Sequence, residues 1–176
     1  MISIIVPTFN ESKNISKFLN KLKYCNFKHE VIFVDDNSQD DSQNIFKKIK
    51  RKNIRFYIRK DKEKDLSKSV LLGVENATFD YVMVMDCDLQ HSHKDANYMK
   101  KVIFKEKLDM VIGSRFLNKK LRGNLYLVRS IISLIFIAFI NFFFIKKTTD
   151  PLSGFFICKK KIIIENKKNY FLKGYK

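Results

Sequence analysis

Short β-forming runs alternate with longer amphipathic segments, and this alternation constrains the fold more than any other feature of the chain. Five runs are predicted strands: Ile2–Pro7, Val31–Asp35, Ile54–Ile58, Tyr81–Met85 and Met110–Gly113. The segments between them have apolar residues at helical spacing and are predicted helices: Ser12–Leu22, Gln39–Ile49, Asp65–Ala77 and Lys94–Lys105. The repeated strand–helix–strand order predicts an α/β fold in which helices cover both faces of a mainly parallel sheet.

The composition fits one globular domain with a sizeable core. The chain has 176 residues, of which 45% are hydrophobic and 30% are charged, so it is too apolar for a disordered protein. Lys and Arg number 35 against 18 Asp and Glu, which gives a net charge of +17. This charge favours anionic partners such as phosphates, nucleic acid or an acidic membrane face, but a lysine-rich composition from an AT-rich genome explains it equally well.

The cysteines favour a reducing, cytoplasmic setting. Cys25, Cys87 and Cys158 are far apart, form no C-x-x-C pair and leave one cysteine over in any disulfide scheme. The chain opens on the strand-like run from Ile2 to Val6 without a basic segment before it, so we expect no secretory signal.

A long apolar stretch occupies Ser130–Ile145 and carries no charged residue. A membrane-spanning helix needs about 20 apolar residues, so this stretch is short for that role. Arg129 precedes it and Lys146 follows it. It is therefore predicted to be either a buried core helix or a helix lying in the membrane interface.

Polar clusters follow four of the predicted strands. They are Pro7–Glu11, Asp35–Ser38, Asp86–Asp88 and Gly113–Arg115. Asn, Asp and Ser after a strand are common turn formers and helix caps, so any one cluster has an ordinary structural explanation. In an open parallel sheet, however, ligands bind beyond the carboxyl ends of the strands. Four such clusters at one edge predict a binding site there.

The sharpest cluster is the triplet Asp86-Cys87-Asp88, directly after a strand rich in Val and Met. In an extended chain the two carboxylates point to the same side and would repel each other. A hard divalent cation, Mg²⁺ or Mn²⁺, removes this repulsion and completes its coordination with phosphate oxygens and water. The triplet therefore predicts a metal-bound diphosphate. His91 and His93 could add a ligand, although such histidines are more often ordinary loop residues.

Five motifs occur in a fixed order along the chain. They are I-I-V-P-T-F-N-E from Ile4, V-D-D-N-S from Val34, M-D-C-D from Met85, G-S-R-F from Gly113 and D-P-L-S-G-F from Asp150. Together they resemble the family 2 glycosyltransferases of GT-A (Rossmann-like) fold, and among them the dolichyl- or polyprenyl-phosphate mannosyltransferases and glucosyltransferases. The resemblance implies an inverting, metal-dependent transfer of a sugar from GDP-mannose or a UDP-sugar to a polyprenyl phosphate such as dolichyl or undecaprenyl phosphate.

The resemblance also implies which residues bind the donor. Those implied to contact the nucleotide-sugar are Pro7, Phe9, Glu11, Val34, Asp36, Asp86, Cys87 and Asp88. Asp86 and Asp88, assisted by Gln90, are implied to hold the metal. Phe9 stands where the family usually has Tyr, so a hydroxyl is lost while the ring can still pack. Asp65–Ser69 occupies the place of a segment that is usually glycine-rich.

Two arginines are candidates for binding the acceptor phosphate. The guanidinium groups of Arg115 and Arg129 offer paired donors that match phosphate oxygens, and Ser133 follows Arg129 by one helical turn. Alternatively, Arg129 only ends an apolar helix at the water boundary. Together with Asp86 and Asp88, the two arginines form the candidate catalytic set. A phosphate acceptor is already largely ionised near neutral pH, so we expect the transfer to need little acid–base help.

We therefore expect one GT-A domain over residues 1–176, in which 1–116 bind the nucleotide-sugar and metal and 117–160 bind the acceptor at the membrane interface. We expect the protein to associate with the cytoplasmic face of the membrane and to have no nucleic-acid partner. Similar enzymes continue for a few dozen residues beyond Lys176, so we expect the C-terminal end to be incomplete. Two alternatives stay open: a family 2 enzyme with a hydroxyl acceptor, for which Asp150 is the candidate base, and an inactive nucleotide-sugar-binding fragment.

Overall fold

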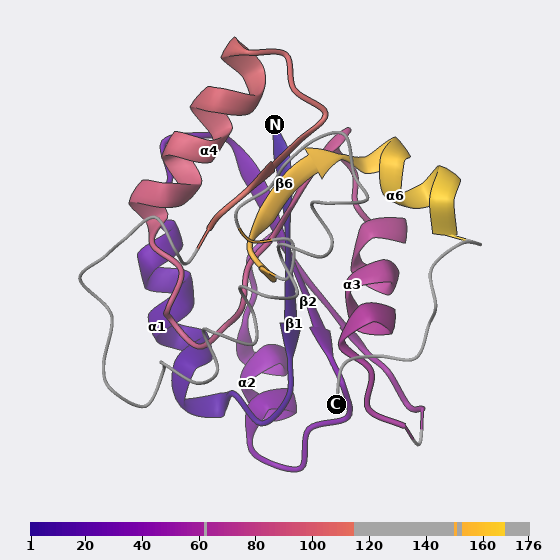
Figure 1. The fold of residues 1–176 in the computed structure, drawn as a ribbon. Coiled ribbons are helices and arrows are strands. Elements are labelled where there is room, and N and C mark those ends of the chain that lie inside the picture. Colours follow the sequence, from indigo (N-terminus) through magenta and orange to yellow (C-terminus); the bar gives the residue numbers. More distant parts are fainter. Residues whose placement is uncertain (62, 115–149, 151–152, 168–176) are drawn as a thin grey trace, which may run out of the picture. The chain divides into compact units, whose positions relative to one another are not determined.

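A six-stranded mixed sheet forms the centre of the fold. The computed structural model describes residues 1–61, 63–114, 150 and 153–167 (Figure 1). The strands run in the order β3-β2-β1-β4-β6-β5. Their bounds are β1 (Ile2–Thr8), β2 (His29–Asp35), β3 (Ile54–Ile58), β4 (Tyr81–Val84), β5 (Met110–Ile112) and β6 (Phe156–Lys159). The first four strands are parallel and β6 is antiparallel to β4, which confirms the predicted α/β class.

Helices cover both faces of this sheet (Figure 1). They are α1 (Ser12–Leu22), α2 (Ser42–Lys48), α3 (Leu66–Glu75), α4 (His93–Lys105) and α6 (Lys160–Asn166). Ile4 belongs to the core that the sheet forms with α1, α2 and α4, whereas Ile5 belongs to the core formed with α3. Neighbouring strand residues point to opposite faces, so alternate residues of β1 supply the two cores.

Local sequence explains where the helices begin and how closely they pack. Helix α2 was predicted to begin at Gln39 but begins at Ser42, because Asp40 bridges two helix starts. Its carboxylate accepts from Ser12 N at 2.9 Å and from Ser42 N at 3.0 Å. Burial raises the pKa of Asp40, but the hydrogen bonds from Ser42 and Ser12 outweigh it and lower the pKa to about 2. In α3, a Cβ atom at Gly73 would overlap Ile5, so only glycine allows this close approach to the sheet.

The chain forms two compact units. One comprises Met1–Val111 together with the residues from Gly154 onward, and the other comprises Ile112–Ser153. The apolar stretch Ile131–Ile145 lies outside the described residues. In the part of the chain that the structure describes, no helix combines the length and the apolar character needed to cross a membrane.

A buried carboxylate joins the amino ends of several strands. Glu30 Oε1 accepts from Ser3 Oγ at 2.6 Å and from Thr78 N at 2.7 Å, and Oε2 accepts from Arg55 at 2.6 Å. Burial raises the pKa of Glu30, but the hydrogen bonds from Ser3, Thr78 and Arg55 outweigh it and hold the pKa below its ordinary 4.5. Because its partners lie on β1, on β3 and just before β4, this one side chain fixes four segments of the sheet.

We expect Glu30→Gln to lower the free energy of unfolding by about 1–3 kcal/mol near neutral pH, because buried donors lose an acceptor. The pKa of Glu30 is lowered on folding, so its stabilisation is fully present above pH 4.5 and is lost as the pH falls below that value. Urea unfolding of parent and variant should therefore give stabilities that differ near neutral pH and converge in acid. Glu165→Gln, at an exposed residue of α6, is the control, and equal stability of parent and Glu30→Gln at every pH would contradict the prediction.

Candidate active site

The carboxyl ends of β1, β2 and β4 meet at one edge of the sheet. Thr8 of β1 lies opposite Asp35 of β2, and Asp36 N donates to Thr8 O at 2.8 Å. On the other side of β1, Met85 N donates to Ile5 O at 3.0 Å. The polar segments that follow these three strands are therefore brought to the same edge.

The turns that follow β1 and β2 are locked together. Asn10 and Asn37 have positive φ angles of 56° and 57°, a conformation that asparagine adopts more readily than most residues. Asn10 Oδ1 accepts from Gln39 N at 2.8 Å, and Asn10 N donates to Ser38 Oγ at 2.8 Å. Asp35 accepts from Ser38 N at 2.9 Å. These side chains hold the turns in place, as the ordinary turn-forming explanation predicts.

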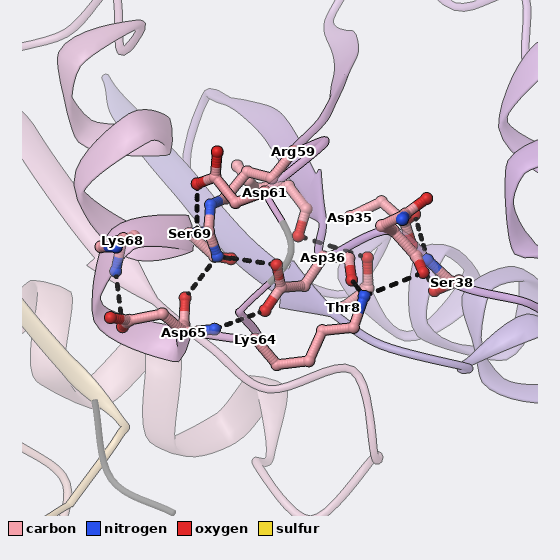
Figure 2. Close-up of polar contacts among 12 residues, drawn as sticks. Thr8, Asp35, Asp36, Ser38, Arg59, Asp61, Lys64, Asp65, Lys68 and Ser69 are labelled. Carbon is pink, nitrogen blue, oxygen red and sulfur yellow. Dashed lines mark hydrogen bonds and ion pairs between the residues drawn. The ribbon is translucent and has the colours of Figure 1, made fainter. Parts of the chain in front are cut away.

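Asp36 is buried beside these turns and forms an ion pair (Figure 2). Its Oδ1 accepts from Arg59 at 2.7 Å and its Oδ2 accepts from Asp65 N at 2.7 Å. Arg59 is only 4% exposed at its side chain, and it also donates to Asp65 O at 2.8 Å and to Ser69 Oγ at 3.3 Å. The network joins the end of β2 to the start of α3. Arg59 was not predicted as a site residue; the available signal was a single arginine directly after the third strand.

An exposed aromatic ring lies beside this network. Phe9 is 45% exposed, and Lys64 Nζ lies 4.8 Å from the centre of its ring. The same ammonium group donates to Asp36 O at 2.5 Å and to Asn37 O at 3.1 Å. A ring that is exposed at the edge of the sheet offers a flat surface on which another ring can stack. Its cation partner is attracted to the ring by the cation–π interaction.

The aspartate triplet follows β4 at the same edge. Asp86 is 39% exposed at its side chain, and Asp88 is exposed and accepts from Gln90 N at 3.0 Å. Burial, with added repulsion from the charges of Glu11, Asp88 and Asp86, raises the pKa of the Cys87 thiol to about 12. Cys87 is therefore a neutral thiol packed into the core, and it separates two carboxylates that face water.

The carboxylate oxygens of the triplet are ligands that suit a hard divalent cation. Among the described residues, no lysine or arginine forms an ion pair with Asp86 or Asp88, so their charges are not neutralised by a basic side chain. The same residues contain no cluster of three or more His, Cys, Asp or Glu that could hold a metal alone. Two carboxylates suit Mg²⁺ or Mn²⁺ that takes its remaining ligands from a bound phosphate and water.

The remaining predicted residues divide into three groups. Pro7 and Val34 are buried opposite each other in the β1–β2 register, so their side chains pack in the sheet. Glu11 is half-buried at a hollow of about 560 Å³, which is lined by Asn10, Glu11, Ser12, Lys13, Asn14, Gln39 and Asp40. Neither Asp86 nor Asp36 lines that hollow, so we define the site by the chemistry of the strand ends. The predicted acceptor residues lie outside the described part of the chain: Arg115, Arg129 and Ser133.

The two histidines after the triplet have separate contacts. His91 lies 3.2 Å from Asp86 Oδ2, whereas the ring of His93 packs against Tyr24 with 5.3 Å between centroids. Asp150, the candidate base for a hydroxyl acceptor, is fully buried.

Helices on both faces of a mainly parallel sheet, with an acidic pair directly after β4, define the fold as that of the GT-A glycosyltransferases. The chain belongs to glycosyl transferase family 2, whose family model matches residues 3–167.

Relatives and solved structures agree with this assignment. The chain is 32% identical over 166 residues to the dolichol-phosphate mannosyltransferase of Pyrococcus furiosus, covering 92% of this chain and 47% of the relative. The crystal structure of S. aureus TarS 1–349 has a TM-score of 0.67 and 20% identity, covering 94% of this chain and 49% of that chain. Glucosyl-3-phosphoglycerate synthase from Mycobacterium tuberculosis, solved with Mn²⁺, UDP and glucosyl-3-phosphoglycerate, has a TM-score of 0.65 and 16% identity. The match covers 93% of this chain and 58% of the synthase chain. This chain thus spans about half the length of these proteins.

We expect Arg59→Met to lower the free energy of unfolding by about 3–5 kcal/mol, because the buried carboxylate of Asp36 loses its charged partner. Asp61 supplies the matched control: it accepts from Arg59 at 2.6 Å but is 59% exposed at its side chain. Asp61→Asn should leave the stability almost unchanged, because an exposed ion pair contributes little. Chemical denaturation measures both effects, and similar stability of Arg59→Met and the parent would contradict the role given to this pair.

Proposed function

We propose that this chain binds the nucleotide-sugar donor and the metal ion of an inverting hexosyltransferase whose acceptor is a polyprenyl phosphate. The observation that carries the proposal is the pair Asp86 and Asp88, two carboxylates exposed to water at the sheet edge that also holds Phe9 and Asp36. The proposal is supported by the pairing of β1 with both β2 and β4, because Phe9 and the two carboxylates follow neighbouring strand ends.

The nucleoside is assigned to the segments after β1 and β2. Phe9 offers its exposed ring for stacking against the base. Asp36 and the backbone of Pro7 and Val34 form the wall beside it, and Glu11 lies at the far end of the same turn. The pair between Asp36 and Arg59 keeps the wall rigid, so little ordering remains to be done when the nucleotide binds.

The diphosphate and the metal are assigned to the segment after β4. Asp86 and Asp88, with help from Gln90, would hold Mg²⁺ or Mn²⁺, which would neutralise the charge that develops on the departing nucleoside diphosphate. The M. tuberculosis synthase of the same fold was crystallised with Mn²⁺ and UDP, which supports this choice of cation. The nucleotide-sugar is GDP-mannose or a UDP-sugar.

The acceptor is assigned to residues 117–160 together with Arg115, and the donor to residues 1–116. The P. furiosus relative is a dolichol-phosphate mannosyltransferase, which supports a polyprenyl phosphate acceptor. Arg115, Arg129 and Ser133 would bind its phosphate, leaving the phosphate oxygen free to attack the anomeric carbon. The net charge of +17 and the apolar stretch Ile131–Ile145 support association with the cytoplasmic face of an anionic membrane.

Asp88→Asn should abolish Mn²⁺-dependent donor binding without lowering stability, because the carboxylate is exposed and its hydrogen bond from Gln90 N is local. A thermal-shift panel of GDP-mannose, UDP-glucose and UDP-N-acetylglucosamine with Mn²⁺ identifies the donor of the parent. The same panel with EDTA should give no shift, and Asp95→Asn, at an exposed residue of α4, should behave like the parent. Equal donor shifts in parent and Asp88→Asn would disprove the metal assignment.

Arg129→Ala should leave donor binding nearly unchanged but weaken use of a short-chain polyprenyl phosphate by about 2–4 kcal/mol, the scale of losing one partner of a buried charge pair. Arg129→Lys should recover only part of this loss, because a point charge cannot reproduce a bidentate contact. Acceptor binding measured by calorimetry gives the same comparison without turnover. An equal loss of donor affinity would move Arg129 to the donor side.

A further inference from the structure

One side chain beside the aspartate triplet, that of His91, has no part in the proposed function. His91 Nε2 lies 3.2 Å from Asp86 Oδ2, and its side chain is only 14% exposed, against 39% for Asp86. An ionised carboxylate can only accept a hydrogen bond, so the histidine nitrogen is the donor. This hydrogen bond therefore fixes the position of one carboxylate oxygen of Asp86, Oδ2.

The ring of His91 is itself held in place. It stacks on Phe155, with 4.5 Å between ring centroids and 25° between ring planes, and Phe155 is 4% exposed. Phe155 lies there because β6 is antiparallel to β4 and pairs Phe156 with Val84. The residues just before β6 therefore lie beside the residues just after β4.

Gly154 completes the surroundings of the same carboxylate. A Cβ atom at this position would lie 3.3 Å from Asp86 Oδ2 and 3.7 Å from Asp86 Oδ1. The φ angle of Gly154 is not positive, so glycine provides space here and not an unusual backbone conformation. A Cβ atom at 3.3 Å would be a tight contact, so the Asp86 carboxylate would have to shift by a few tenths of an ångström.

We infer that His91, Phe155 and Gly154 form a clasp that fixes the direction of the Asp86 carboxylate toward the donor, and that His91 is a positioning residue for cation binding. The inference rests on the proposed function, because it assigns a purpose to the orientation of a proposed metal ligand. Carboxylates that bind metals are usually oriented by such outer hydrogen bonds, and losing one typically weakens metal binding by about 10- to 100-fold. The clasp also gives a function to two residues of the D-P-L-S-G-F motif, Gly154 and Phe155.

The test compares the Mn²⁺ dependence of nucleotide binding in full-length variants. Fluorescence anisotropy of mant-GDP and mant-UDP gives the Mn²⁺ concentration for half-maximal binding. His91→Phe keeps a ring to stack on Phe155 but removes the donor, and it should raise that concentration by about 10- to 100-fold. His91→Gln keeps an N–H donor and should recover most of the loss. Gly154→Ala should act in the same direction as His91→Phe.

Controls separate this role from a general effect on folding. His93→Gln changes a histidine that packs on Tyr24 and should bind like the parent. Thermal unfolding without metal should give His91→Phe and Gly154→Ala midpoints close to that of the parent. If His91→Phe does not fold, Gly154→Ala decides the question alone, since it adds only one methyl group.

The outcomes distinguish the clasp from the proposed function. Parent-like Mn²⁺ dependence in His91→Phe and Gly154→Ala overturns the clasp while the proposed function stands, provided that Asp88→Asn loses binding. A loss that His91→Gln shares, with an equal fall in unfolding temperature, also overturns the clasp, because it makes His91 a structural residue. Mn²⁺-independent nucleotide binding in the parent overturns the metal assignment itself, and the clasp with it.

Discussion

The central strand β1 pairs in parallel with β2 on one side and with β4 on the other, and the candidate site depends on this shared strand. Parallel pairing brings the carboxyl ends of all three strands to one edge, so the backbone alone makes segments distant in sequence neighbours. Glu30 fixes the opposite, amino ends of the same strands through its bonds to Ser3, Arg55 and Thr78. The backbone therefore positions the site before any ligand is present.

The carboxylates in the two halves of this edge differ in burial and in whether a basic side chain balances their charge. Asp36 is buried and its charge is balanced by Arg59 at 2.7 Å, whereas the Asp86 and Asp88 carboxylates have no basic side chain paired with them in the part of the chain that the structure describes, apart from the contact of Asp86 with His91. A balanced buried pair gives a rigid wall, and an unbalanced exposed pair leaves a local negative potential. The proposed division between a nucleoside side and a metal side follows from this contrast.

Periodicity and strand ends were enough to predict the parallel strands, the helices α1, α3 and α4, and the gathering of the polar segments after β1, β2 and β4. They were not enough for interactions between distant residues. Arg59 pairs with Asp36 across 23 positions, and no local pattern indicates such a partner. The strand β6 was not predicted, because the apolar run around Phe156–Lys159 continues into the helix α6 and has no clear period. His91 was considered as a metal ligand or a loop residue, and its bond to Asp86 depends on a side-chain direction that spacing cannot reveal. The acceptor arginines remain predictions.

The strands β5 and β6 are neighbours in the sheet although the residues from 113 to 155 separate them in the chain. The chain thus leaves the sheet at one strand and returns at the adjacent one, so no strand register depends on the length of what lies between. The entropic cost of closing a connection between neighbouring strands grows only slowly with its length, so we expect changes of length between these two strands to cost little. Under the proposed division of the chain, recombination that exchanges the part between Ser114 and Ser153 would change the acceptor side, while the residues assigned to the donor, and Gly154 and Phe155 beside Asp86, would stay in place.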